Sequence, residues 1–199
     1  MARKFLEPTV KVVKNQYKVK GDFHSIIPNK PIFDEKKVLR GVTNPREMTY
    51  IHAYGGESVF FESIPKGKLL GAQCVNDDCE FPGTVWIPYR SCCPDCLSKN
   101  EPTDITDCAK ETATVHSFMV TERTGAFNTL DIPIKFINVE FDHPNIDTIL
   151  MGYLSHGEPE IGMRVVPIFK KKNPTYTITD LSWVPEGTPH SKLPKDLSF

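Results

Sequence analysis

The chain has 199 residues, of which 39% are hydrophobic and 25% charged. This is the composition of an ordinary globular protein, and the length allows a sizeable core in one large or two small domains. The sequence has no apolar run of 18 residues, which excludes a membrane-spanning helix, and its N-terminus lacks the apolar stretch of a signal peptide. We therefore expect a cytoplasmic protein, in which thiols stay reduced and clustered cysteines hold metal.

Charge is unevenly distributed along the chain. Residues 1–40 contain ten Lys/Arg and four Asp/Glu, a net charge of +6, and because the whole chain has a net charge of -1 the remainder sums to -7. A basic segment of this kind suits an acidic partner, a phosphate-bearing ligand or nucleic acid. A solvated surface segment is the simpler interpretation of the same charges.

The first 47 residues form an N-terminal extension rich in proline and lysine. Within it, "VKVVKNQYKVK" (residues 10–20) alternates apolar and polar residues on both sides of Asn15-Gln16, which predicts a short hairpin or an edge strand. A segment this short cannot bury itself, so we expect it to lie on the rest of the chain or on a partner.

Residues 48–66 are predicted to be partly helical, because Val59, Phe60, Phe61 and Ile64 recur at helical spacing. Two short strands are expected next, in "GKLLGAQC" (residues 67–74) and "GTVWIPYR" (residues 83–90). They flank a first cysteine pair and lead to a second, so residues 67–100 are interpreted as a zinc ribbon.

The pattern becomes purely β after a polar stretch at residues 97–111. Five strand candidates lie in residues 113–122, 131–142, 147–156, 163–172 and 175–185, each bounded by Gly, Pro, Asn or Asp. Their number and short connections favour a five-stranded OB-fold barrel over residues 101–185, with a Greek-key sandwich as the alternative. The predicted fold class is therefore mainly β, and residues 186–199 are expected to form an extended tail.

Four cysteines have the spacing of a metal site: Cys74-x4-Cys79-x13-Cys93-x2-Cys96. Two close pairs flanking a hairpin can bring four thiolates onto one tetrahedral ion, and zinc is the expected structural metal, with iron as the alternative. Cys93 is preferred to its neighbour Cys92 because it gives the usual two-residue gap to Cys96, with Pro94 fixing the turn. Cys92 is interpreted as a packing residue and Cys108 as a plain thiol in a polar loop.

Several motifs together resemble a known family. These are the aromatic pair Phe60/Phe61, the stretch Gly67–Gly71, the pattern Pro-x-Arg-x-x-Cys-Pro-x-Cys over residues 88–96, and "EPEIGMRVVPIF" at residues 158–169. The combination resembles the acyl-CoA-associated family that joins a rubredoxin-like zinc ribbon to an OB-fold (domain of unknown function 35). The resemblance covers roughly residues 48–185 and leaves out the N-terminal extension. The four-residue gap between Cys74 and Cys79 departs from the family's usual two.

The resemblance implies a non-catalytic accessory subunit. Proteins of this family look like partners of a thiolase-fold catalytic subunit, in a hetero-oligomer with two copies of each chain. The partner carries out carbon–carbon bond chemistry on an acyl-CoA, and the small subunit helps to bind or shield the coenzyme A thioester. Lys/Arg would be needed for the phosphates of coenzyme A, and Arg90, Lys66 and Lys68 are the candidates. Solvation or pairing with nearby acids is an equally good interpretation of these three side chains.

The residue types suggest three other functions. Cys92 or Cys108 with His52, His116 or His156 would supply a nucleophile and a base, but no motif places them together, so the chain is expected to lack catalytic residues. A single-stranded nucleic-acid binder is the main alternative, because OB barrels and zinc ribbons both serve that role. It is disfavoured because residues 101–199 contain more Asp/Glu than Lys/Arg. A rubredoxin-like electron carrier would require iron.

Overall fold

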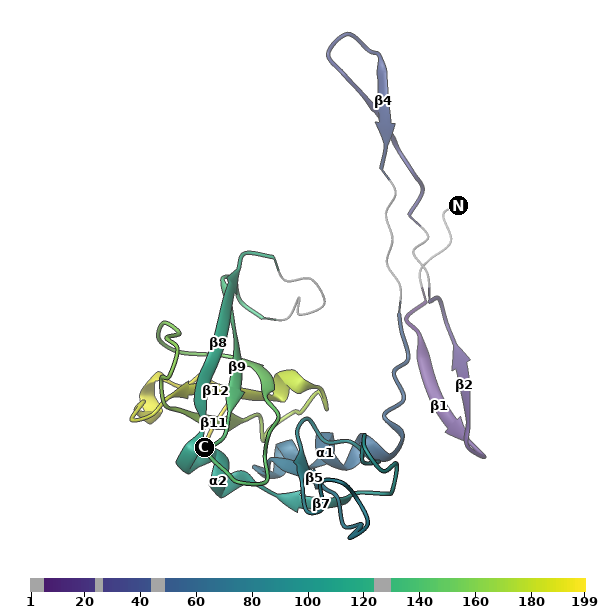
Figure 1. Ribbon diagram of the computed structural model, residues 1–199. Helices are drawn as coiled ribbons and strands as arrows, with labels where there is room; N and C mark the ends of the chain where they lie inside the picture. The colour runs from purple at the N-terminus through teal and green to yellow at the C-terminus, as the bar shows by residue number, and fades with distance from the viewer. Residues whose placement is uncertain (1–5, 24–26, 44–48, 124–129) are drawn as a thin grey trace. The chain divides into compact units, whose positions relative to one another are not determined.

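A computed structural model describes residues 6–23, 27–43, 49–123 and 130–199 (Figure 1). The chain divides into two compact units, Met1–Ala53 and Tyr54–Phe199. Within the described residues, no helix has the length and apolarity needed to cross a membrane.

The described residues of the N-terminal unit form two β-hairpins. Strands β1 (Thr9–Val13) and β2 (Gln16–Lys20) pair antiparallel, which confirms the hairpin predicted from the alternation. Lys14 and Asn15 form the two-residue turn with φ of 51° and 58°, the positive values that a type I′ turn requires at both positions. A second hairpin, β3 (Pro31–Phe33) and β4 (Leu39–Val42), was not predicted.

The second unit begins with a short helix. Helix α1 (Ser58–Ser63) lies between the 3-10 turns η1 (Gly55–Glu57) and η2 (Ile64–Lys66), so only the later part of the predicted helical segment is helical. Phe60 and Ile64 are buried one turn apart on the same face, as the apolar spacing indicates. Gly67 ends the segment with φ of 74° and donates its backbone N–H to the carbonyl of Ile64.

A three-stranded antiparallel sheet carries the cysteines. Strand β5 (Leu70–Gln73) lies between β6 (Val85–Trp86) and β7 (Glu101–Asp104). Strand β7 and the following helix α2 (Thr106–Thr112) fall in the stretch for which the sequence predicted no regular structure. Cys108 therefore lies on a helix and packs against the core, and its prediction as a residue of a polar loop was wrong.

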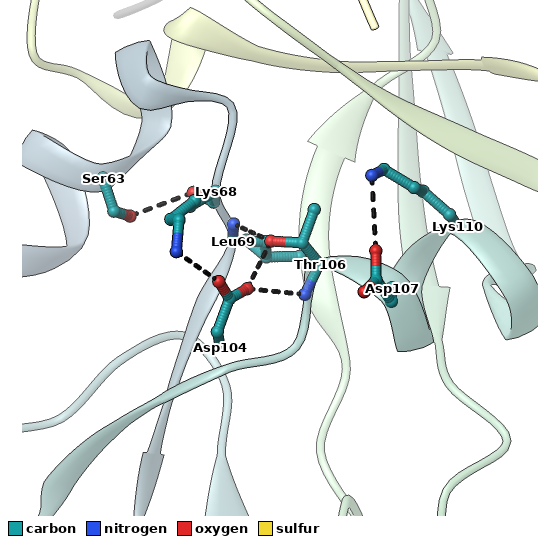
Figure 2. A network of polar contacts seen from close by, with 7 residues as sticks. All are labelled: Ser63, Lys68, Leu69, Asp104, Thr106, Asp107 and Lys110. Carbon is teal, nitrogen blue, oxygen red and sulfur yellow. Dashed lines mark hydrogen bonds and ion pairs between the residues drawn. The ribbon is translucent and has the colours of Figure 1, made fainter.

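The junction between this sheet and α2 is built by a small polar network (Figure 2). The Asp104 carboxylate accepts hydrogen bonds from the backbone N–H and the hydroxyl of Thr106, at 3.1 and 2.5 Å, and forms an ion pair with Lys68 at 2.9 Å. The Thr106 hydroxyl in turn accepts the backbone N–H of Leu69 at 2.9 Å. These bonds tie the start of β5 to the end of β7 and to the first turn of α2.

The last five strands close into a barrel. Strand β8 (Thr114–Thr121) pairs with β9 (Ile134–Glu140), which pairs with β10 (Leu150–Tyr153), and β11 (Val165–Phe169) pairs with β12 (Leu181–Pro185), all antiparallel. Two isolated bridges complete the ring. Thr114 pairs with Arg164 beside β11, and Leu154 meets Trp183 in parallel beside β10. The resulting order β8-β9-β10-β12-β11 is the five-stranded Greek-key barrel of the OB type, which confirms the predicted fold class.

One continuous apolar core runs through the second unit. It is centred on Trp183, which is fully buried, and on Ile137 and Val139 of β9. Leu69, which directly precedes β5, and Val85 of β6 belong to the same core, so the ribbon and the barrel are packed as one body. The C-terminal segment is also tied to this body, because Ser198 forms an antiparallel bridge with Phe169 at the end of β11.

The loop between β11 and β12 is organised by one buried carboxylate. Asp180 is 1% exposed and accepts the backbone N–H groups of Thr175 and Tyr176 at 2.8 and 2.7 Å and the Thr175 hydroxyl at 2.8 Å. The Tyr54 hydroxyl donates to the carbonyl of Tyr176 at 2.7 Å, which fixes the loop against the start of the α1 segment.

Replacing Asp180 with alanine is expected to lower the free energy of unfolding by about 2 kcal/mol, because the loop N–H groups lose a charged acceptor. Urea denaturation of the full chain would measure the change. Asp180→Asn, which keeps one acceptor oxygen, should cost less, and Asp196→Ala, at an exposed position, should have little effect. Equal stability of Asp180→Ala and Asp196→Ala would show that the carboxylate does not stabilise the loop.

Candidate metal centre and neighbouring cleft

The structure brings the four predicted cysteines into one cluster. The Sγ atoms of Cys74, Cys79, Cys93 and Cys96 all lie within 4.8 Å of one another. Cys74 and Cys96 are 3.7 Å apart at sulfur, and Cys79 and Cys93 are 3.9 Å apart. A tetrahedral ion at the zinc–sulfur distance of about 2.3 Å holds its sulfurs about 3.8 Å apart, so the donor set fits a metal such as zinc.

Local backbone bonds hold each cysteine pair in a tight loop. In the first pair, the Cys79 N–H donates to the Asn76 carbonyl at 3.1 Å, and the Gly83 N–H donates to the Cys74 carbonyl at 3.0 Å. In the second pair, the Leu97 N–H donates to the Cys93 carbonyl at 3.0 Å. The loops start from β5 and from the segment after β6, so the paired strands bring the two loops together.

The thiols of the cluster differ in acidity. The side chain of Asn76 and then the side chain and backbone of Ser98 lower the pKa of Cys96 to about 6, so this sulfur is largely thiolate at neutral pH. The Asp95 carboxylate, which accepts the Cys79 thiol at 3.0 Å, raises the pKa of Cys79, and burial raises it further. Metal binding would therefore release the Cys79 proton.

The two remaining cysteines lie outside the cluster. Cys92 is exposed and forms an isolated backbone bridge with Lys99 across the second loop, so its interpretation as a packing residue was wrong. Cys108 is half-buried on α2, where its sulfur lies 3.4 Å from the Thr112 hydroxyl. If four protein sulfurs hold one tetrahedral ion, they fill all its positions and leave no open position for water or substrate.

Leu97 is held in a strained conformation directly after the last cysteine of the cluster. Its φ is 61°, in the left-handed region, and its side chain is 76% exposed. This region is sterically unfavourable for leucine but not for glycine. Because the Leu97 side chain is exposed, its burial does not compensate for the strain.

Leu97→Gly is therefore expected to raise the free energy of unfolding of the metal-loaded protein by about 0.5–1 kcal/mol, after the larger chain entropy of glycine is subtracted. Thermal unfolding with metal in excess would measure it. Leu97→Ala is the matched control, because it removes the same exposed side chain but keeps the strain. A glycine variant no more stable than the alanine variant would contradict the argument.

A mostly apolar cleft of about 600 Å³ lies beside the cysteine-bearing sheet. It is bounded by α1, by the segment that precedes the second cysteine pair, and by β9 and β10 of the barrel. Met151 and Ile149, which are 50% and 41% exposed, form its barrel side. The lining residues are Glu57, Phe60, Phe61, Pro88, Tyr89, Arg90, Asn138, Ile149, Leu150, Met151 and Ile178.

The three predicted coenzyme A contacts lie in different surroundings. Arg90 is exposed and lines the cleft. Lys66 lines a neighbouring cavity of about 430 Å³, which shares Phe61 with the cleft and also includes Tyr54 and Tyr176. Lys68 is held by Asp104 in the junction network and lines neither opening (Figure 2). The sequence could not predict that these apolar residues line one cleft, because they come from segments far apart in the chain.

Of the candidate catalytic residues, His116 and Cys108 each have another partner. His116 pairs with Glu140 through Nδ1 at 2.9 Å on the exposed side of the barrel, away from either free cysteine in its contacts. Cys108 bonds to Thr112 instead of a histidine. Trp183 is fully buried and Trp86 packs against the cysteine cluster, so neither ring is a free stacking platform for bases.

No protein-family model matches the chain, and no curated protein matches it significantly. Among solved structures, it is similar to a protein of unknown function from the DUF35 family of Sulfolobus solfataricus, with 26% identity and a TM-score of 0.45, over 64% of this chain and 83% of that one. It is also similar to a structure described as an Ltp2-ChsH2(DUF35) aldolase, with 22% identity and a TM-score of 0.48, over 65% of this chain and 94% of that one. Both TM-scores are below 0.5, so neither similarity carries a conclusion about function. The chain is thus similar to two solved structures whose descriptions name the family that its motifs resemble.

Proposed function

We propose that the protein is a non-catalytic, zinc-binding accessory subunit of a thiolase-type complex that forms or cleaves a carbon–carbon bond in an acyl-CoA. The observation that carries this proposal is the apolar cleft with Arg90 in its lining, together with the cluster of four cysteines that could hold zinc. The cleft suits the long pantetheine arm of coenzyme A, and a guanidinium suits its phosphates. The closed metal site braces the loop that positions Arg90.

The catalytic groups would belong to a thiolase-fold partner, with two copies of each subunit in the complex. In support, the cleft offers an apolar surface and a cation, and Cys108 and His116 bond to Thr112 and Glu140 rather than to each other. A narrower version rests on resemblance alone: the chain is similar to the small subunit of benzoylsuccinyl-CoA thiolase, an enzyme of anaerobic aromatic degradation. In that case the substrate would be an aromatic acyl-CoA.

The test is isolation of the tagged full chain from its own host, followed by native mass spectrometry and size-exclusion chromatography. We expect co-purification of a thiolase-fold protein, one zinc ion per copy of this chain, and thiolytic activity that requires both proteins. A partner with full activity by itself and no complex on the column would overturn the proposal. Red colour and an iron spectrum would instead indicate a rubredoxin-like site.

Arg90→Ala in the isolated complex tests the role of the cleft. It should raise the KM for acyl-CoA by about tenfold with little change in kcat, because a phosphate contact contributes mainly to substrate binding. Lys68→Ala is the matched control, since it removes a cation that pairs with Asp104 and does not line the cleft. Equal effects of the two variants would argue against a binding role for the cleft.

The alternative of a single-stranded nucleic-acid binder is tested by fluorescence anisotropy with oligonucleotides at low salt. We expect no binding in the micromolar range. Micromolar binding that weakens steeply with salt would favour the alternative.

A further inference from the structure

The N-terminal unit has ordered hairpins but almost no core. Every residue in strands β1 to β4 is exposed except Gly41, which is half-buried. An isolated two-stranded hairpin is at best marginally stable in water, and it becomes stable when one face packs against something. The exposed large apolar side chains of the four strands are Val10, Val12, Val13, Tyr17, Val19, Ile32, Phe33, Leu39 and Val42.

The register of the first hairpin separates two chemically different faces. Val10 is opposite Val19, and Val12 is opposite Tyr17, so these four side chains share one face. On the other face, Lys11 is opposite Lys18, Thr9 is opposite Lys20, and Val13 is opposite Gln16. One face is therefore entirely apolar apart from the tyrosine hydroxyl, and the other is dominated by lysine.

An apolar face of this kind, on a ribbon with no third strand, marks an interaction site. The four residues of the apolar face are between 40% and 62% exposed. They expose an area on the order of a few hundred Å², a substantial part of the roughly 800 Å² that each partner buries in a standard protein interface. Lysine side chains are long enough to reach around the edges of a two-stranded ribbon towards carboxylates beside the apolar contact.

We infer that hairpin β1–β2 is a docking element for the catalytic partner subunit, with its apolar face on an apolar strip of the partner and its lysines facing acidic groups beside that strip. This inference rests on the proposed function for the existence of the partner. We expect the partner's surface to be acidic, because residues 1–40 have a net charge of +6, from ten Lys/Arg and four Asp/Glu. The hairpin that would dock lies in the N-terminal extension, which the family resemblance does not cover.

The other surfaces that could receive the hairpin are less suitable. The apolar openings of the chain's own second unit carry balanced charge, with Glu57 and Arg90 at the cleft and Glu62 and Lys66 at the neighbouring cavity. Neither opening by itself attracts a lysine-rich ribbon, but residues 41–199 sum to -7, so docking on the chain's own second unit is the competing outcome that the cross-linking test below detects. The apolar face has three valines and only one aromatic ring, which does not make a stacking platform for nucleic-acid bases.

The test compares Val12→Asp with Val13→Asp in the full chain, co-expressed with the thiolase-fold protein that co-purifies with it. Both variants change the net charge equally and lie next to each other in β1, but on opposite faces of the hairpin. Val12→Asp should weaken the complex at least about tenfold, because it places a carboxylate in the apolar contact, whereas Val13→Asp should change it by less than about threefold. Affinity would be measured by titration of the separated subunits.

A second measurement identifies the occupant directly. A photo-cross-linking amino acid at position 12 of the full chain should form a covalent link to the partner subunit in the isolated complex, and the same group at position 13 should do so much less. Cross-links to the same chain or to a second copy, or equal effects of the two aspartate variants, would overturn the inference. If no thiolase-fold protein co-purifies with the unmodified chain, the proposed function fails instead, and the two failures are thus distinguishable.

Discussion

Replacing Cys93 with serine is expected to abolish metal binding and to destabilise the second unit, whereas replacing its neighbour Cys92 is expected to do neither. Cys93 is fully buried and its sulfur lies 3.9 Å from that of Cys79 in the four-sulfur cluster. Serine is a poor ligand for zinc, and the apparent free energy of structural zinc sites in small peptides is about 10–16 kcal/mol at neutral pH. Cys92 is exposed and outside the cluster.

Metal content per chain and thermal unfolding would be measured on all three proteins. We expect one ion per chain in the unmodified protein and in Cys92→Ser, and none in Cys93→Ser. The unfolding temperature of Cys93→Ser should fall by on the order of 10 °C or more, and chelator should bring the unmodified protein to a similar state. Metal retained in Cys93→Ser but lost in Cys92→Ser would show that the ligand set is wrong.

Gly152→Ala is expected to lower the free energy of unfolding by about 3 kcal/mol, the upper end of the usual cost of overpacking a core. A Cβ at position 152 would lie 2.6 Å from Nε1 and 2.8 Å from Cδ1 of Trp183. Trp183 is fully buried at the centre of the core, next to the parallel bridge that closes the barrel, so its ring has little room to move.

The matched control is Gly41→Ala, because a Cβ there meets no atom within 4 Å and the residue does not need a positive φ. Its effect should stay within about 0.5 kcal/mol. Urea denaturation followed by tryptophan fluorescence would compare the two variants. If Gly152→Ala proves as stable as Gly41→Ala, the contact between β10 and Trp183 is looser than the structure indicates.

The strands and the cluster of four cysteines could be predicted because their signals are local. Alternation such as that around Asn15 and in residues 131–142 identifies strands, and β1, β2 and β9 lie where it predicted them. The choice of Cys93 over Cys92 followed from the spacing to Cys96, and the structure places Cys93 in the cluster.

Other features could not be predicted because they depend on contacts between distant segments. The sequence favoured the barrel but could not exclude the sandwich, because closure depends on the parallel contact of Leu154 with Trp183, which alternation does not encode. Strand β7 and helix α2 were missed because the stretch is polar, and its order comes from the bonds that Asp104 and Thr106 make with each other and with Leu69. The cleft joins Phe61, Arg90 and Met151 from three elements.

The polar network in Figure 2 affects how the second unit unfolds. Since Leu69 contributes both to the polar network and to the shared core, the ribbon is not a detachable module that can melt while the barrel survives. Amide protons of β5 and of the barrel strand β9 should exchange with solvent through the same opening event, and therefore slow down together when metal is added. A bound ion would thus lower the fraction of molecules in which the barrel strands are open to proteases.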